Sequence, residues 1–381
     1  MKNKLKAIFL LFILLLLISC DVSKTDNLSN KSNIINDSKV SKTTEIEILG
    51  MGDLIFHQPI IKNYNENGTY DFSPIFSNVY EDINSADLTI ANFEGTTNLN
   101  RELSGFPLFN FPKESIDSLK NVGFDAMSTA NNHALDTGIE GLIDTINNMK
   151  DNNIRYFGTN LNDSSKGKII DVKGIKVGLI SFTDTLNGMD SIIRGKEYFV
   201  NTFSQDVKRD IQELKENSDV VIVYPHWGIE YQHKPSERQI YLKDKLFEYG
   251  ADIILGSHPH VLQRYENIES SGESKFIIYS MGNFLSNQRQ EFIHREGVET
   301  GCMVKITLLK INDKTEVKNV NVIPTFVNRY WENNKLTYNI IKLEDFKSGG
   351  KLENTVDLKS KKFFLQKLED ANYVLTGVKD E

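Results

Sequence analysis

Side chains of the kinds that bind transition metals recur along this chain, each shortly after an apolar run. Such runs are typical of strands buried on both faces, and sites in open α/β sheets assemble just past the carboxyl ends of the strands. The side chains are Asp53, His57, Asn92, Glu94, Asn131, Asn132, His133, His226, His258, His260 and Asn283. Carboxylate, imidazole and amide oxygen together are ligands of a borderline divalent metal, so the pattern predicts a site for Zn, Mn or Fe.

The predicted site holds one or two ions. Two ions roughly 3.5–4 Å apart would hold a bridging hydroxide and clamp a phosphoryl group between them. Each motif taken alone has a plainer interpretation, because a histidine after a strand is usually structural, and Asn131-Asn132 or Gly282-Asn283 suits a turn. However, five of the seven histidines belong to this set. The recurrence after one strand and then the next favours a shared metal site.

The segments that must position these residues alternate between strand and helix patterns. Strands are expected at residues 45–49, 87–92, 126–130, 176–182, 220–224, 253–255 and 276–280. Helices are expected at residues 115–121, 138–150, 203–216 and 236–249. Lys173-Gly174 is a plausible hairpin turn. This alternation predicts an α/β domain in which helices cover a sheet.

Beyond residue 299 the pattern changes to alternating strands with no helices between them. These strands are expected at residues 303–309, 317–323 and 336–343, and a last helix at 359–372. We expect them to form a second, antiparallel sheet packed on the first. The folded domain is then expected to span residues 44–381.

The start of the chain has the composition of an export signal. Lys2, Lys4 and Lys6 precede an apolar run of 12 residues at 7–18. A membrane-spanning helix needs about 20 apolar residues, so this run is too short for one and predicts a signal peptide over residues 1–19. An uncleaved signal anchor is the alternative.

Cys20 ends the sequence Leu-Ile-Ser-Cys directly after the apolar run. This tetrapeptide looks like a bacterial lipobox, in which the cysteine becomes the first residue and carries a lipid; a chance cysteine is the alternative. Residues 20–43 are rich in Ser, Asn, Lys and Asp, a composition typical of a flexible tether. The sequence thus predicts a lipoprotein anchored to the cell membrane and facing outside the cytoplasm.

Charge and composition exclude some classes of function. The formal net charge is −8, and loss of a leader with three lysines would leave about −11. Nucleic-acid affinity depends on cationic neutralisation of phosphates, so no nucleic-acid partner is expected. Hydrophobic residues make up 39 % and charged residues 25 %, which is ordinary for a globular domain. The second cysteine, Cys302, is expected to be a small buried hydrophobe.

Taken in order, the motifs resemble the CapA family of bacterial poly-γ-glutamate capsule biosynthesis proteins. The motifs are Gly52-Asp53 with His57, Asn92-Phe93-Glu94, Asn131-Asn132-His133, His226-Trp227-Gly228, Gly256-Ser257-His258-Pro259-His260 and Gly282-Asn283-Phe284. The resemblance covers about residues 45–286. It implies a variant of the calcineurin-like metallophosphatase fold, a β-sandwich of two packed mixed sheets flanked by helices.

The resemblance also implies roles for individual residues. Asp53 would bind the first metal and Glu94 would bridge both. Asn132 and His226 would bind the second, and His258 and His260 would complete the pair, one on each metal. His133 would bind no metal and would protonate the leaving group or stabilise developing charge. Asn92, Asn131 and Asn283 would lie beside the ligands or contact substrate.

The sequence departs from the metallophosphatase pattern at two positions. The usual Asp-x-His is stretched to Asp53…His57, which leaves the role of His57 open. The usual bridging Asp is replaced by Glu94, which is one methylene longer. Both departures bear on whether two metals are held at the ordinary spacing.

Two classes of function remain open from the sequence. The first is a metal-dependent hydrolase or transferase that acts on a phosphoester or an amide-linked anionic polymer at the cell surface, including a general envelope phosphoesterase. The second is a non-catalytic subunit of a polymer synthesis and export complex. The resemblance implies a poly-γ-glutamate system with membrane-embedded synthase partners in either case. His133 beside a full ligand set favours the enzyme, because a scaffold needs no general acid.

Overall fold

The structure is a computed structural model that describes residues 42–162, 166–270 and 272–377. These described residues belong to one compact unit. The expected signal peptide, Cys20 and the tether up to residue 41 lie outside the described residues. Strand β1 begins at Thr43, one residue before the expected start of the folded domain. Across the described part of the chain, no helix is both long and apolar enough to cross a bilayer.

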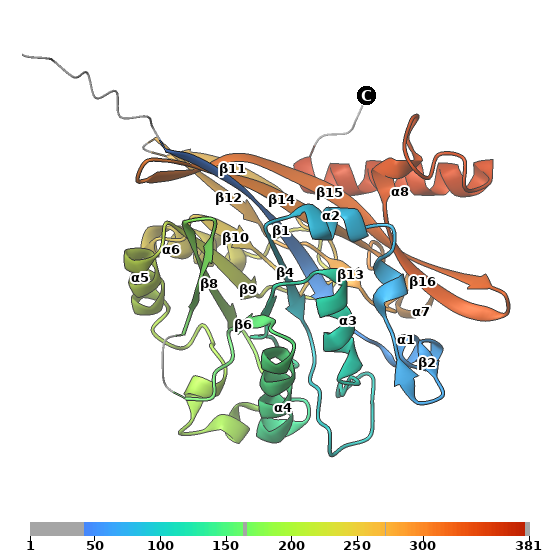
Figure 1. Cartoon of the computed structure of the whole chain (residues 1–381), viewed down its shortest axis with the longest axis horizontal. Coiled ribbons are helices and arrows are strands. Elements are labelled where there is room, and N and C mark those ends of the chain that lie inside the picture. The colour runs from blue at the N-terminus through green and yellow to red at the C-terminus, as the bar shows by residue number, and fades with distance from the viewer. Residues whose placement is uncertain (1–41, 163–165, 271, 378–381) are drawn as a thin grey trace, which may run out of the picture. The chain divides into compact units, whose positions relative to one another are not determined.

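The first sheet has eight strands (Figure 1). Their bounds are β1 (Thr43–Leu54), β4 (Leu88–Phe93), β5 (Ala126–Ser128), β6 (Arg155–Phe157), β13 (Asn283–Leu285), β14 (Thr300–Ile311), β15 (Lys314–Glu332) and β16 (Lys335–Lys342). Seven of them follow the order β16-β15-β14-β1-β4-β5-β6, and β13 pairs with the last residues of β1. β1, β4, β5 and β6 are parallel, so their carboxyl ends meet at one edge.

The expectation of a separate C-terminal sheet is wrong. β14 pairs antiparallel with β1 from Thr43↔Ile311 to Met51↔Met303, and β15 and β16 extend the first sheet beyond it. After pairing with β4, β1 still presents a row of unpaired N–H and C=O groups along its other edge. The long β14 strand satisfies these groups. The alternating pattern revealed the C-terminal strands, but such a pattern does not specify which edge a strand joins.

The second sheet has six strands in the order β11-β12-β10-β9-β8-β7. Their bounds are β7 (Lys168–Val172), β8 (Ile175–Thr183), β9 (Val220–His226), β10 (Ile253–Leu255), β11 (Tyr265–Ser270) and β12 (Glu273–Ile278). The central four strands are parallel, and the edge strands β7 and β11 are antiparallel. The turn predicted at Lys173-Gly174 joins β7 to β8, and both residues have positive φ, as a tight two-residue hairpin requires.

The apolar faces of the two sheets pack against each other. Ile48 of β1 belongs to the same buried cluster as Ile222 of β9 and Leu255 of β10. Leu49 and Met51 face the opposite side of β1 from Ile48. They belong to a different cluster, on the outer face of the first sheet. This alternation is the two-residue period of a strand. The predicted sandwich of two mixed sheets is therefore confirmed.

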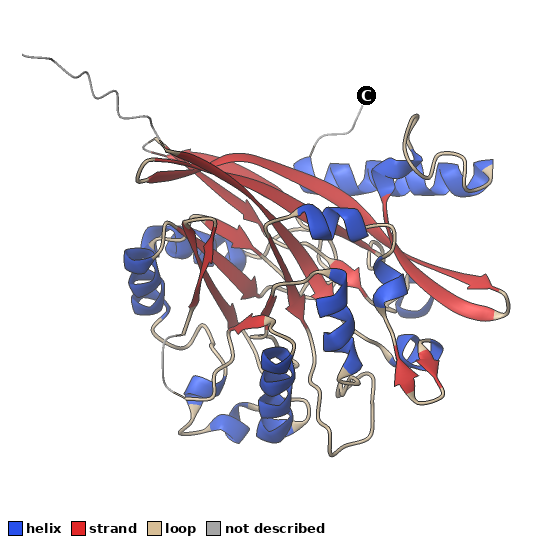
Figure 2. Ribbon diagram, in the orientation of Figure 1, coloured by secondary structure: helices blue, strands red, loops and turns tan. Residues whose placement is uncertain are grey.

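Helices cover the outer faces of the sandwich (Figure 2). The helices are α1 (Gln58–Asn63), α2 (Tyr80–Ser85), α3 (Glu114–Val122), α4 (Gly138–Asp151), α5 (Val207–Asn217), α6 (Glu237–Tyr249), α7 (Gln290–Ile293) and α8 (Leu358–Thr376). α3 and α4 pack on the first sheet through Ile116 and Met149. α5 and α6 pack on the second through Ile211 and Leu246. The helix expected at 203–216 begins only at Val207, because the side chain of Asp206 caps its N-terminus.

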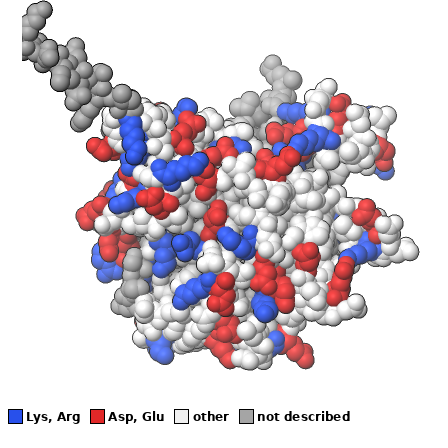
Figure 3. Space-filling model, in the orientation of Figure 1, with Lys and Arg blue, Asp and Glu red and all other residues white. Residues whose placement is uncertain are grey.

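Smaller elements complete the described chain. They are the ribbon of β2 (Asn65–Glu66) and β3 (Thr69–Tyr70) and four 3₁₀ turns at Ser73–Phe76, Asp190–Ile193, Glu197–Phe199 and Leu343–Phe346. Cys302 is fully buried in the interior of the sandwich, as predicted. On the face shown in Figure 3, acidic and basic side chains are interspersed and form no basic stripe.

Strand β1 contains a β-bulge just before Asp53, the first of the expected metal ligands. The pairing of β1 with β4 shifts register between Gly50 and Asp53. A bulge of this kind frees backbone groups from the ladder and re-aims the following side chain. Tyr224 of β9 satisfies the freed groups from the opposite sheet. Its hydroxyl accepts a hydrogen bond from the Met51 N–H and lies 3.2 Å from the carbonyl oxygens of Met51 and Ile90.

We expect Tyr224→Phe to lower the free energy of unfolding by about 1–3 kcal/mol, because it leaves buried backbone groups of β1 without a partner. Chemical denaturation measures the change. Tyr241→Phe is the control, since Tyr241 is 59 % exposed. Equal stability of the two variants would show that the hydroxyl does not support the bulge.

Candidate metal centre

Strands of both sheets end at the same edge of the sandwich, and the six residues expected to bind metal gather there. They are Asp53 in β1, Glu94 just past β4, Asn132 past β5, His226 at the end of β9, and His258 and His260 past β10. All six are buried, with exposed fractions of 0 to 7 %. The fold thus brings together side chains that are up to 207 residues apart in the sequence.

A glycine allows the chain to approach this edge closely. A Cβ atom on Gly52 would lie 1.9 Å from the carbonyl oxygen of Gly282. The N–H of Asp53 donates to the same oxygen at 3.0 Å. β13 can therefore run beside the end of β1, which places Asn283 opposite Asp53.

One half of the centre is built around His226. Its Nε2 lies 2.8 Å from Asn132 Oδ1, 3.0 Å from His258 Nδ1 and 3.8 Å from Glu94 Oε1. The other ring nitrogen, Nδ1, lies 3.1 Å from Ser257 Oγ. Ser257 Oγ donates to the carbonyl oxygen of Pro225 at 3.4 Å, so Ser257 Oγ can accept from His226 Nδ1–H. In that tautomer the lone pair of His226 is on Nε2, as metal binding requires.

The atoms around His226 Nε2 are an amide oxygen, a second ring nitrogen and a carboxylate oxygen, all of kinds that can bind a metal. Asn132 presents its oxygen, because its Nδ2 donates to Asn187 Oδ1 at 3.4 Å. Glu94 Oε1 is buried and has no hydrogen-bond partner among the described residues. Buried acceptors crowded together are costly unless a cation lies among them. Imidazole, amide oxygen and carboxylate are suitable ligands for such a cation, so these residues fit a divalent transition metal.

The other half of the centre is built around His260. Its Nδ1 lies 3.1 Å from Asn283 Oδ1 and 3.2 Å from Asp53 Oδ2. Asn283 Nδ2 faces three acceptors, the carbonyl oxygens of His260 and Val298 and Gln288 Oε1, so Asn283 Oδ1 must accept. The proton of His260 is then on Nδ1, and Nε2, 3.6 Å from Glu94 Oε1, is free to bind metal.

Glu94 links the two halves. Its Oε1 atom faces ring nitrogens of both His226 and His260. One ligand atom each from Asp53, Glu94 and His260 lie within 4.8 Å of one another. This placement suits the bridging position expected for Glu94, with Asp53 and His260 on one side and Asn132, His226 and His258 on the other.

Burial controls the charge of these groups in the metal-free protein. Burial, followed by repulsion from His258, holds the pKa of His226 well below its usual value. Burial likewise lowers the pKa of His258 to about 4. These imidazoles are thus neutral near pH 7, which is the form that binds metal. Burial, followed by repulsion from Asp53, raises the pKa of Glu94 well above its usual value, and a bound cation would favour the ionised form.

The asparagines expected beside the ligands hold them in place. Asn92 Nδ2 donates to Asp53 Oδ1 at 2.8 Å. Asn131 Nδ2 donates to the carbonyl oxygen of Phe93 at 2.8 Å and lies 3.3 Å from Asn92 Oδ1. Both amides therefore orient the ligands and the strand ends that they contact.

His133 is oriented by a carboxylate that the sequence reasoning did not assign. His133 Nδ1 lies 2.7 Å from Asp136 Oδ2, which also accepts from the backbone N–H of Phe109. The ring of Phe109 packs on the imidazole at 4.6 Å. His133 Nδ1 therefore carries the proton and Nε2 is available to exchange another. The spacing His-x-x-Asp in the sequence is the signal that could have identified Asp136.

His57 lies beside the centre but outside its ligand groups. It directly precedes α1, is half-buried, and its ring packs against Phe109 at 5.3 Å between ring centres. Burial, followed by repulsion from His260 and His133, lowers its pKa to about 3. Among the described residues, the groups that can hold a metal do not include His57. One group does include Glu230, which the sequence analysis missed; its position four residues after His226 was the available signal.

His258 and His260 have backbone conformations that residues other than glycine rarely adopt. His258 has φ 95° and His260 has φ 57°. Residues held in this left-handed region cost of order 1–3 kcal/mol each and cluster at functional sites. The strain is an independent sign that these histidines are placed for function.

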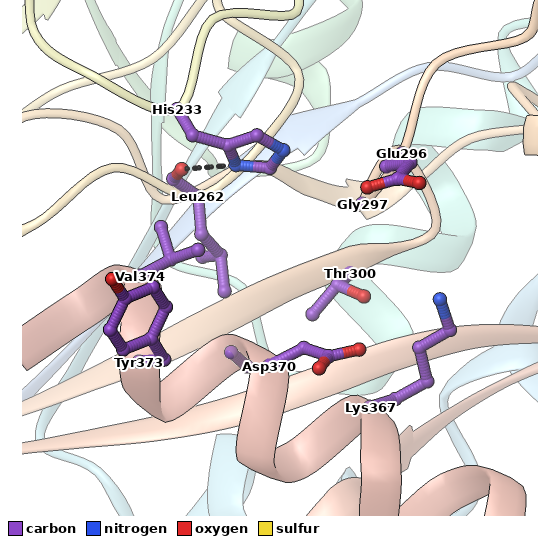
Figure 4. Close-up of a pocket in the computed structure, with 10 residues that line it drawn as sticks. His233, Leu262, Glu296, Gly297, Thr300, Lys367, Asp370, Tyr373 and Val374 are labelled. Carbon is purple, nitrogen blue, oxygen red and sulfur yellow. Dashed lines mark hydrogen bonds between the residues drawn. The ribbon is translucent and has the colours of Figure 1, made fainter. Parts of the chain in front are cut away.

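A separate pocket of about 270 Å³ lies between α8 and the segment before β14 (Figure 4). His233, Glu296, Lys367 and Asp370 line it. None of the six expected ligands is among its lining residues. The two histidines outside the predicted set, His233 and His294, line pockets away from the centre and belong to neither of its ligand groups.

Comparison with known families decides the classification. A family model described as Bacterial capsule synthesis protein PGA_cap matches residues 47–288, well over half of the chain. The chain belongs to this family. Every expected metal ligand of this PGA_cap protein lies within the matched residues. The resemblance to the CapA family is confirmed.

Two PGA_cap-type relatives come from Bacillus. The chain is 30 % identical over 250 residues to the capsule biosynthesis protein CapA of Bacillus anthracis, an alignment that covers 62 % of this chain and 59 % of that protein. It is 29 % identical over 244 residues to the PGA biosynthesis protein CapA of Bacillus subtilis (strain 168), with 62 % of each covered. The chain thus spans about three fifths of the length of these relatives.

Solved structures align with the PGA_cap chain at low identity. A hypothetical protein from Thermus thermophilus aligns with a TM-score of 0.43 and 15 % identity, covering 73 % of this chain and 98 % of that one. The calcineurin-like phosphoesterase YfkN from Bacillus subtilis aligns with a TM-score of 0.41 and 17 % identity, covering 87 % and 99 %.

Proposed function

We propose that this protein is a cell-surface lipoprotein of poly-γ-glutamate capsule or related envelope-polymer biosynthesis, with a metal-dependent hydrolase site. The observation that carries the proposal is the convergence of buried amide, imidazole and carboxylate groups around His226 Nε2, beside the unpartnered Glu94 Oε1. The match to the PGA_cap family and the similarity to the CapA proteins of Bacillus support a role in capsule biosynthesis.

A division of labour among the residues follows from the geometry. Divalent ions supply Lewis acidity and lower the pKa of a bound water when they occupy such a site. Asp53, Glu94, Asn132 and the three histidines around them fix the ligand geometry. His133, held through Nδ1 by Asp136, presents Nε2 as the proton donor for a leaving group. Substrates that suit this arrangement are a phosphoester or the amide link of an anionic polymer.

A non-catalytic role in polymer assembly is the second candidate, and one observation favours it. Among the described residues, His57 lies outside both groups that can hold a metal. In this role the metal would be structural, and the partners would be membrane-embedded synthase subunits.

Direct assay separates these candidates. The full chain, solubilised in detergent, is loaded with Mn²⁺ or Zn²⁺ and tested against p-nitrophenyl phosphate and γ-glutamyl p-nitroanilide. Turnover that chelator removes and metal restores supports the hydrolase. Metal binding with no turnover of either substrate, or of isolated poly-γ-glutamate, would favour the assembly subunit.

The anchor is tested by Cys20→Ala. We expect this variant to leave the membrane fraction or to keep its leader, because buried acyl chains provide the attachment. Fractionation and metabolic labelling with a fatty acid measure the result, and Cys302→Ala is the matched control because Cys302 is fully buried. Continued lipid labelling of Cys20→Ala would contradict the lipoprotein proposal.

A further inference from the structure

Glu230 adds a carboxylate to the metal centre. One oxygen of Glu230 and one ring nitrogen each of His258 and His260 lie within 4.8 Å of one another. His260 also belongs to the group formed with Asp53 and Glu94. Glu230 therefore adjoins the first-metal half through His260 and the second half through His258. It is solvent-exposed, whereas the other members of both groups are buried, so it approaches from the open side.

The backbone that carries Glu230 is fastened to the segment that carries the two histidines. The N–H of Tyr231 donates to the carbonyl oxygen of Pro259 at 2.8 Å. Two residues further, His233 Nδ1 donates to the carbonyl oxygen of Leu262 at 3.1 Å, the dashed bond in Figure 4. These bonds follow Glu230 directly along the chain and limit how far it can move from the centre. The position of the Glu230 carboxylate near the two histidines is thus fixed by backbone contacts of the fold.

Among the described residues, the first-metal half of the centre has one expected donor fewer than the second half, which has Asn132, His226, His258 and the shared Glu94. Asp53, Glu94 and His260 supply three donors, and the longer spacing of Asp53 to His57 keeps the His57 imidazole out of the group. We propose that Glu230 is a ligand of the metal held by these three residues and takes the place of the displaced imidazole. The inference rests on the proposed metal centre and names a residue that the sequence motifs did not.

The proposed ligand changes which metal each half prefers. With Glu230, the first half offers three carboxylates and one imidazole, whereas the second offers two imidazoles, an amide oxygen and the shared Glu94. Carboxylate-rich sites suit harder ions such as Mn²⁺, while imidazole suits Zn²⁺. The first half is therefore selective for Mn²⁺ relative to the second. Because Glu230 faces solvent, it is also the ligand that an incoming anionic group would displace.

Metal binding by Glu230→Gln tests the proposal. The full chain in detergent is stripped of metal and titrated with Mn²⁺ and with Zn²⁺ by calorimetry, and the Mn²⁺ form is examined by electron paramagnetic resonance. We expect the wild type to hold two ions. Glu230→Gln should retain the second-half ion and bind the other at least about 10–100-fold more weakly, since loss of even an outer-shell partner costs this much. The spin-coupled signal of a Mn²⁺ pair should disappear.

Two further variants control the experiment. Glu213→Gln removes an exposed carboxylate on α5, outside both groups that can hold a metal, and should bind both ions like the wild type. Glu230→His should restore the weakened ion and shift its preference from Mn²⁺ towards Zn²⁺. Melting of the metal-free proteins verifies that each variant is folded.

The outcomes separate this proposal from the proposed function. Wild-type affinity for both ions in Glu230→Gln would overturn the assignment of Glu230. A wild type that takes up neither Mn²⁺ nor Zn²⁺ would overturn the metal centre itself, and Glu230 with it. Selective loss of one ion in Glu230→Gln, in a protein that hydrolyses no substrate, would support Glu230 as a ligand while contradicting the hydrolase.

Discussion

Glu94→Gln is expected to abolish bound metal and metal-dependent activity together. Glu94 Oε1 lies 3.6 Å from His260 Nε2 and 3.8 Å from His226 Nε2, so one substitution affects both halves of the centre. Glutamine preserves the shape but not the negative charge that two divalent ions would share. The loss of activity should therefore exceed the loss from removing a proton donor alone. Elemental analysis and calorimetric titration measure the metal.

Glu94→Gln should not lower the stability of the metal-free protein, although it removes metal binding. Burial and repulsion from Asp53 raise the pKa of Glu94, so the folded state keeps a proton that the unfolded state releases above about pH 4.5. This difference lowers stability as the pH rises through that region. Metal-free Glu94→Gln should thus melt at or above the wild-type temperature at pH 7. It should gain nothing from added metal, whereas the wild type gains about 2.7 kcal/mol at a metal concentration of 100 Kd.

Two results would contradict this account of Glu94. Unchanged metal content would remove Glu94 from the ligand set. A large fall in metal-free stability at pH 7 would show that Glu94 is a packing residue and not a carboxylate held in place for a cation.

His133→Ala is expected to retain metal and to lose activity by about 10²–10⁴-fold, the usual contribution of positioned proton transfer. His133 Nδ1 is committed to Asp136 at 2.7 Å, and the residue is in neither group that can hold a metal. Rates per bound metal and calorimetric affinity measure the two quantities separately. His258→Ala is the matched control, because a ligand variant should lose metal and activity in parallel.

The role of Asp136 can be measured in the same assay. Asp136→Asn should keep the metal and lower the rate per bound metal, because the amide no longer fixes the orientation and tautomer of the His133 ring. A purely structural Asp136 would change the melting temperature and leave the rate per folded molecule unaltered.

Two other results of the His133→Ala experiment would give His133 or the metal a structural role. If His133→Ala lowers the melting temperature and leaves the rate per folded molecule unchanged, His133 stabilises the segment after β5. If His133→Ala cells make their surface polymer normally while Glu94→Gln cells do not, the metal is structural. That second result would favour the assembly subunit over the enzyme.

The donor set and most of the elements that carry it are determined by local sequence. A strand buried on both faces requires a continuous apolar run, so β9 and β10 could be located, and with them the polar residues that follow. Helix ends are also encoded locally. Ser236 and Gln239 form a capping box at the start of α6, which begins within one residue of its expected position.

Pairings between distant segments were decided only by the tertiary structure. β14 joins the free edge of β1, because the hydrogen bonds of a strand edge accept any strand of suitable length, and alternation does not name the partner. The bulge before Asp53 depends on the hydroxyl of Tyr224, a residue from the other sheet.

The same distinction applies within the metal centre. The residue types of Asp53, Glu94 and the histidines already predicted a metal, because ligand chemistry is a property of the side chain. The exclusion of His57 and the approach of Glu230 depend on where the chain turns after β1 and after β9. Those turns are fixed by hydrogen bonds to remote segments, such as Tyr231 N–H to Pro259, which no pattern along the chain can specify.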